Sequence, residues 1–110
     1  MKNKSITVPV EALTEEEMKN VMSLVMTGSL TLEEIKSINS LLSMRMETLQ
    51  TQFREVDENY KRITASHIED FDYLCSVSSR RAELYQQIEK LKKAILNNKE
   101  VIIDEDNQDY

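Results

Sequence analysis

Apolar residues over most of the chain recur at an average spacing of 3.5 positions. One column, with members seven residues apart, runs from Ile35 to Leu91, and eight of its nine members are apolar. A companion column runs from Met46 to Ile95, and six of its eight members are apolar or aromatic. Only a repeat of this length keeps one stripe of a helix facing a partner helix. The pattern therefore predicts an all-α fold with an antiparallel coiled coil over about 31–98.

The stripe formed by the two columns is too narrow to be buried by one helix alone. It has to meet a second helix, either from the same chain or from another copy. We name its central members the seam and expect self-association to run through them. The seam residues are Leu42, Met46, Leu49, Phe53, Val56, Tyr60, Leu74, Val77, Leu84, Ile88 and Leu91.

A shorter helix is predicted before the coiled coil, over about 14–27. Thr14 and Glu17 have the spacing of a capping box, in which each side chain accepts a hydrogen bond from the free backbone N–H of the other residue. Gly28 follows the last apolar residue of this helix, and glycine most readily adopts the left-handed conformation that ends helices. Residues 1–13 contain the single Pro and a short apolar alternation, which predicts an extended arm.

Two architectures satisfy the long repeat. Residues 32–98 can form one continuous helix that dimerises, or the chain can fold back near residues 64–66 as a hairpin. The uninterrupted heptad phase and the lack of Gly and Pro favour one helix, whereas the polar exceptions His67 and Asp70 fall where a loop would lie. Both alternatives stay open from the sequence.

The direction of pairing is better constrained. Antiparallel pairing centred on residue 65 sets Phe53 beside Val77 and lays the basic segment 80–99 along the more acidic segment 31–58. Parallel pairing would place basic residues beside basic residues, which costs a few tenths of a kcal/mol for each pair of like charges. The charge distribution therefore favours antiparallel helices.

Composition limits the chemistry that the chain can carry. Its 110 residues include one Gly, one Pro, one Cys and one His, so the residues from which a loop-built active site is made are nearly absent. A zinc site needs three or four Cys or His ligands, and the neighbourhood of His67, Asp70 and Cys75 supplies too few. We expect no enzyme activity, no cofactor and no metal, and interpret His67 and Asp70 as polar residues that fix the register or face solvent.

Features that direct proteins to membranes or to secretion are missing from the sequence. A lone Cys75 cannot form an internal disulfide, and the first ten residues lack the apolar stretch of a secretory signal. No apolar run approaches the roughly 18–20 residues that cross a bilayer. We expect a cytoplasmic protein without membrane association.

The net charge of -6 is concentrated at the C-terminus, because residues 100–110 hold five acids and no base. We predict a single helical domain over 14–98 and an acidic tail over 99–110. Segment 80–99 holds six bases and two acids, and such a segment can follow a phosphate backbone. Its bases are spread around the helix, so direct nucleic-acid binding is not expected.

The tail contains an apolar triplet followed by acids, which is the form of a peptide that adds a strand to the sheet edge of a partner. Its members are Val101, Ile102, Ile103, Asp104, Glu105 and Asp106. The pattern is similar to SUMO-interacting motifs, and that resemblance implies a partner-binding tail. The alternative is that the triplet packs on the end of the helical domain.

These observations predict a non-enzymatic coiled-coil module that self-associates as an antiparallel homo-dimer or higher oligomer. It would bind an unidentified protein as an adaptor, scaffold or inhibitor. The alternative is a regulator of nucleic-acid transactions that uses the basic helix 80–99 or an acidic tail imitating nucleic acid.

Overall fold

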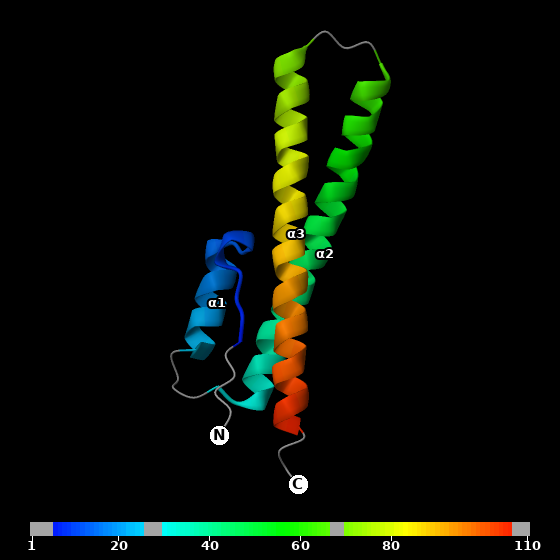
Figure 1. Ribbon diagram of the computed structural model, residues 1–110. Coiled ribbons are helices and arrows are strands. Elements are labelled where there is room, and N and C mark those ends of the chain that lie inside the picture. The colour runs from blue at the N-terminus through cyan, green and yellow to red at the C-terminus, as the bar shows by residue number, and fades with distance from the viewer. Residues whose placement is uncertain (1–5, 26–29, 67–69, 107–110) are drawn as a thin grey trace.

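The computed structural model describes residues 6–25, 30–66 and 70–106, except for the side chains of residues 105 and 106. A 3-10 helix at Val10–Ala12 precedes three α-helices, which are α1 (Glu15–Val25), α2 (Leu32–Ala65) and α3 (Phe71–Asp106). Helices α2 and α3 run antiparallel as a long hairpin, and α1 lies beside the half of the hairpin that holds the termini (Figure 1). The molecule measures 63 × 26 × 18 Å, so it is a rod rather than a sphere.

The all-α prediction is confirmed, and of its two alternatives the structure has the hairpin. Helix α2 ends at Ser66, whose backbone N–H and hydroxyl both donate to the carbonyl of Arg62, at 3.2 and 2.9 Å. Helix α3 begins after Asp70, whose carboxylate accepts a hydrogen bond from the backbone N–H of Tyr73 at 3.1 Å. Side chains of Ser and Asp therefore satisfy the helix ends that Gly or Pro would otherwise mark.

The predicted capping box at Thr14 is present, and a second capping box starts α2 at Thr31. The backbone N–H of Thr14 donates to Glu17 at 2.8 Å, and the backbone N–H of Glu17 donates to the Thr14 hydroxyl at 3.2 Å. Thr31 and Glu34 make the same exchange at 2.9 and 3.2 Å. The predicted helix stop at Gly28 lies outside the described residues.

The seam residues lie between α2 and α3 of one chain. Those that are buried are Leu42, Leu49, Val77, Leu84, Ile88 and Leu91. Those that are half-buried are Met46, Phe53, Val56, Tyr60 and Leu74. Folding back buries six of these residues and half-buries the other five, so most of the seam is removed from water within one chain.

The register of the hairpin differs from the predicted centre at residue 65. The Phe53 and Tyr85 rings lie 6.2 Å apart between centroids, and Arg80 donates to Gln52 at 3.3 Å. The residue halfway along the sequence between Phe53 and Tyr85 is 69, and the residue halfway between Gln52 and Arg80 is 66. Both lie beyond the predicted centre of the hairpin. The physical reason is the connection itself, because the residues that follow Ala65 belong to the turn and displace α3 along α2.

Helix α3 continues to Asp106, so the predicted boundary of the acidic tail, 99–110, falls inside a helix. Val101 is buried, Ile102 is half-buried and Ile103 is exposed. The triplet is therefore helical and packs its first member on the hairpin, as in the alternative in which it packs on the helical domain rather than adding a strand to a partner. Residues 99–106 include no helix-breaking residue, and burial of Val101 stabilises the additional turns of α3.

Candidate functional site

The N-terminal segment covers one face of the hairpin in the half that holds the termini. The backbone N–H of Thr7 donates to Asn98 Oδ1 at 2.8 Å, and Asn98 Nδ2 donates to the Thr7 carbonyl at 3.0 Å. Asn97 Nδ2 donates to the Thr7 hydroxyl at 2.8 Å. The fully buried Asn98 amide thus pairs with both backbone groups of one residue, as a neighbouring strand would.

Charged residues fasten the same segment to both long helices. On α2, Arg45 Nε donates to the Ala12 carbonyl at 2.9 Å and lies 3.5 Å from the Glu17 carboxylate. On α3, Lys90 lies 3.6 Å from the carboxylate of Glu11. The segment from Thr7 to Glu17 therefore acts as the cover of this face.

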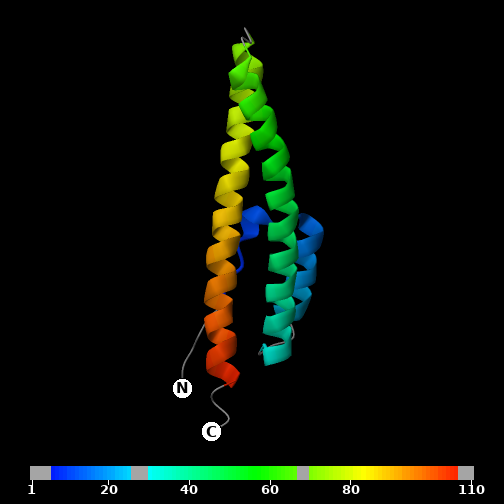
Figure 2. The ribbon, with the colours of Figure 1, turned by 90° about the vertical axis from the view of Figure 1, so that its right-hand side faces the viewer.

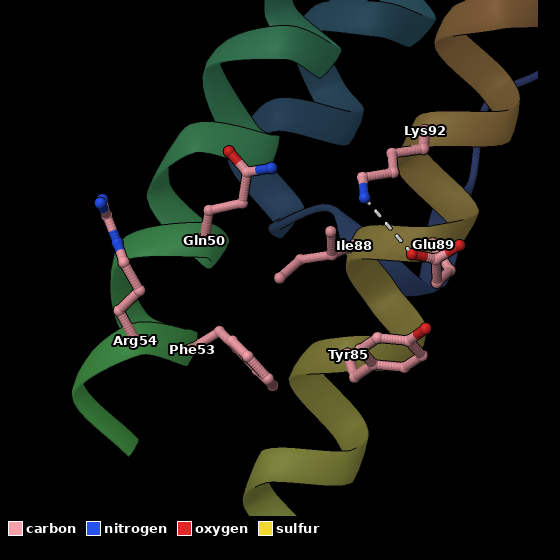
Figure 3. Close-up of a pocket in the computed structure, with 7 residues that line it drawn as sticks. All are labelled: Gln50, Phe53, Arg54, Tyr85, Ile88, Glu89 and Lys92. Atoms are coloured by element: carbon pink, nitrogen blue, oxygen red, sulfur yellow. Dashed lines mark hydrogen bonds and ion pairs between the residues drawn. The ribbon is translucent and has the colours of Figure 1, made fainter. Parts of the chain in front are cut away.

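The opposite face of the hairpin holds an open groove between α2 and α3. Figure 3 shows the groove with the N-terminal segment passing behind the two helices. Its volume is about 340 Å³. It is lined by Gln50, Phe53, Arg54, Tyr85, Ile88, Glu89 and Lys92.

Toward the turn, the groove continues past Arg81, which links the two helices. Arg81 Nε donates to Asp57 Oδ1 at 2.6 Å, and its guanidinium carbon lies 5.6 Å from the centre of the Phe53 ring and 5.0 Å from that of Tyr60. Lys61 lies 3.1 Å from the other oxygen of Asp57. The hydrogen bond from Arg81, followed by that from Lys61, lowers the pKa of Asp57 below its ordinary 3.8. Arg81 lines a second hollow, which shares Phe53 and Tyr85 with the groove, and its cation is held between aromatic rings and a carboxylate.

The half of the hairpin nearest the turn is only two helices thick within the described residues, as Figure 2 shows. Phe71, Tyr73 and Tyr85 are exposed there. Asn59 donates to the Tyr73 hydroxyl at 3.2 Å and positions that ring on the surface. We name this surface, from the turn to Lys92 and including the groove, the open face. Phe71 and Tyr85, which are 14 positions apart, lie on the same side of α3, and large apolar residues exposed on one surface are typical of interaction sites.

The residues considered for metal binding are not brought together in the described part of the chain. Among those residues, no group of three or more His, Cys, Asp and Glu side chains could hold a metal ion. His67 lies outside the described residues, Asp70 caps α3, and Cys75 is exposed. No described helix combines the length and the apolar character that a membrane span requires.

Most basic residues of segment 80–99 form ion pairs with acidic residues of the same chain. Four of its six bases form ion pairs, which join Arg80 to Glu83, Arg81 to Asp57, Lys90 to Glu11 and Lys92 to Glu89. A phosphate backbone would have to compete with these carboxylates.

Sequence reasoning missed two side chains that organise the site. Asn98 continues the column that ends at Leu91, and a single Asn in a coiled-coil column is a known sign of a buried polar contact. Arg81 breaks the companion column, and its partner Asp57 could be found only from the register. The signal in the sequence that could have identified both side chains is that each is a polar residue in a column of apolar residues.

Comparison of the chain with protein-family models, with curated proteins and with solved structures found no match.

Proposed function

We propose that the chain is a non-enzymatic protein-binding module that self-associates and acts on another protein as an adaptor, scaffold or inhibitor in the cytoplasm. The observation that carries this proposal is the open face, where Tyr85, 55% exposed, lines the groove and Phe71, 74% exposed, lies nearer the turn on the same side of α3. Large apolar residues exposed along one side of a helix are typical of a surface that a partner covers.

The composition of the open face supports binding of a protein. Tyr and Arg are enriched among residues that dominate binding energy, and here Tyr60, Tyr85 and Arg81 lie together. Arg81 is held by Asp57, so little side-chain freedom remains to be lost on binding. Rigid helices carry all of these groups, which favours a precise docking surface.

The alternative function, regulation of nucleic-acid transactions, has weaker support. The ion pairs of segment 80–99 occupy most of its bases, and residues 101–106 belong to α3 rather than to an extended tail. We therefore keep protein binding as the proposal.

Site-specific photocrosslinking in cells of the source organism tests this function. A benzoylphenylalanine placed at Phe71, which is 74% exposed, probes the open face, and one placed at Met44, which is 69% exposed, is the matched control on the other half of the hairpin. We expect one partner protein to be captured from position 71 and not from position 44. A purified partner should then lose at least tenfold in affinity for Phe71→Glu. Equal capture at both positions, or none at position 71, would contradict the proposal.

A further inference from the structure

A second stripe of apolar residues lies on the surface of α3. Phe71, Tyr85, Leu96 and Ile103 are between 55% and 74% exposed. They are separated by 14, 11 and 7 positions, which are close to whole numbers of turns at 3.6 residues per turn. All four therefore project from the same side of the helix, beside the groove and away from the buried seam.

The positions between these residues complete a repeat with steps of three, four or seven residues. We name this repeat the outer stripe. It consists of Phe71, Ser78, Ala82, Tyr85, Glu89, Lys92, Leu96 and Ile103. Ser78 and Ala82 are small and exposed, and Glu89 and Lys92 form an ion pair at 3.5 Å. A stripe with this period is suited to pack against another long helix.

We propose that a second copy of this chain docks on the outer stripe, with α3 antiparallel to α3 about a two-fold axis between Lys90 and Leu91. This inference rests on the proposed function, because it names the surface through which the chain self-associates. The axis sets Tyr85 opposite Leu96 of the second copy and Ser78 opposite Ile103 of the second copy. A large side chain meets a small one or an apolar one at each of these positions.

Charge complementarity identifies the occupant as a copy of the chain. The same axis places Glu89 opposite Lys92 of the second copy, and the symmetry repeats this pair, so two attractive contacts lie next to the axis. Parallel pairing in register would instead set Glu89 against Glu89 and Lys92 against Lys92. A two-fold interface requires a patch that complements itself, and the outer stripe has that property only in the antiparallel direction.

Tyr85 is already positioned for this contact. Its ring lies 6.2 Å from that of Phe53 on α2, so the groove supports it from one side while 55% of the residue stays exposed. Leu96, at 62% exposed, has no comparable role in the hairpin core. Changing Leu96 therefore tests the interface without removing core packing.

Analytical ultracentrifugation of the full chain tests the assembly. We expect the wild type to sediment at about twice its 12.8 kDa and Leu96→Glu to sediment as a monomer whose thermal midpoint matches that of the wild type diluted below its dimer dissociation constant. Met44→Glu is the matched control, because Met44 is similarly exposed but lies on α2, and it should remain a dimer. A monomeric wild type at high protein concentration, or a Leu96→Glu variant that stays dimeric, would overturn the inference.

A charge reversal tests the proposed axis. Glu89→Lys should weaken dimerisation by roughly tenfold or more, because it places Lys beside Lys across the interface. The double variant Glu89→Lys with Lys92→Glu restores opposite charges both within the helix and across the axis, so it should return the dissociation constant to near the wild-type value. A double variant as weak as the single one would show that these residues do not face each other.

The distance between spin labels on the exposed Cys75 of the two copies reports the direction of pairing. Spin labels on Cys75 of two copies should lie about 45 Å apart, since each is about 15 residues from the axis and the helix rises 1.5 Å per residue. A distance below about 20 Å would indicate parallel helices and refute the antiparallel axis. Failure of these tests would refute self-association through the outer stripe and would leave standing the binding of another protein, which crosslinking at Phe71 tests, so the two outcomes are distinguishable.

Discussion

Arg81 of α3 donates a hydrogen bond to Asp57 of α2 at 2.6 Å while its guanidinium lies over the rings of Phe53 and Tyr60. This one side chain forms an ion pair and contacts two aromatic rings of the other helix. Both interactions require the observed register of the hairpin. The apolar repeat alone would have placed a hydrophobic residue at this position. The open face is built around this exception.

Replacing Arg81 tests whether the planar guanidinium matters beyond its charge. Arg81→Lys keeps the charge but cannot stack on two rings while donating to Asp57, so we expect a lower urea midpoint than the wild type. Arg81→Ala should lower it further. The measurement is urea unfolding followed by circular dichroism at pH 7, and equal midpoints for wild type and Arg81→Lys would contradict the expected role of stacking.

The pH dependence of stability should include a contribution from Asp57. Its pKa is lowered in the folded state by Arg81 and Lys61, so the stabilisation is present above the ordinary pKa of 3.8 and is lost as the pH falls through the folded value. Asp57→Asn should be less stable than the wild type at pH 7, and the difference should narrow below pH 3.8. Urea midpoints of both proteins across this range provide the measurement. A difference that stays constant with pH would refute the assignment.

The Asn98 amide should hold the N-terminal segment in place. Asn98→Leu removes both hydrogen bonds to Thr7 and leaves two backbone groups unpaired, which we expect to cost about 1–3 kcal/mol. Amide hydrogen exchange should rise at Thr7 and Val8 and stay unchanged near Leu49. Asn97→Ala is the comparison variant, because it removes the bond to the Thr7 hydroxyl and the 3.5 Å bond to Asn98 Oδ1 but keeps both Asn98 bonds to the Thr7 backbone, and it should have a smaller effect. Unchanged exchange in Asn98→Leu would contradict this role.

The seam should govern folding of the hairpin rather than its association. Leu84 is fully buried, so Leu84→Ala should destabilise the fold by about 2–5 kcal/mol. Leu96→Ala removes the same atoms from an exposed site and should change monomer stability by less than about 0.5 kcal/mol. Chemical denaturation at low protein concentration separates the two effects. A larger loss for Leu96→Ala than for Leu84→Ala would reverse the assignment of core and surface.

The C-terminal part of α3 should contribute to stability up to Val101. Ending the chain after Lys99 exposes the site that buries Val101, which is worth about 1.5–3 kcal/mol, so the thermal midpoint should fall. Ending it after Asp106 should leave the midpoint near the wild-type value. Differential scanning calorimetry compares the two truncations, and equal midpoints would show that Val101 stabilises nothing.

Local signals in the sequence were sufficient for the helices. The capping boxes at Thr14 and Thr31 locate two helix starts, because they depend only on residues three positions apart. The heptad columns likewise identify the seam, since burial of one stripe follows from the helical repeat. The position of the turn was harder to predict, because Ser66 and Asp70 end and start helices without Gly or Pro.

The candidate site depended on contacts between distant residues. Pairing of Asn98 with Thr7 and of Arg81 with Asp57 requires the register of the hairpin, and the register depends on how many residues the turn consumes. The outer stripe is also visible in the sequence only after the seam has been assigned to the interior of one chain.

The sequence by itself determined the all-α class, the antiparallel direction and the identity of the buried stripe, because helical periodicity and charge act locally or along whole segments. The tertiary structure alone decided that the seam closes within one chain, that the N-terminal segment covers one face and that the other face stays open. Loop length, register and the side on which Asn98 and Arg45 bind that segment are three-dimensional properties, and they determine which surface is left for a partner.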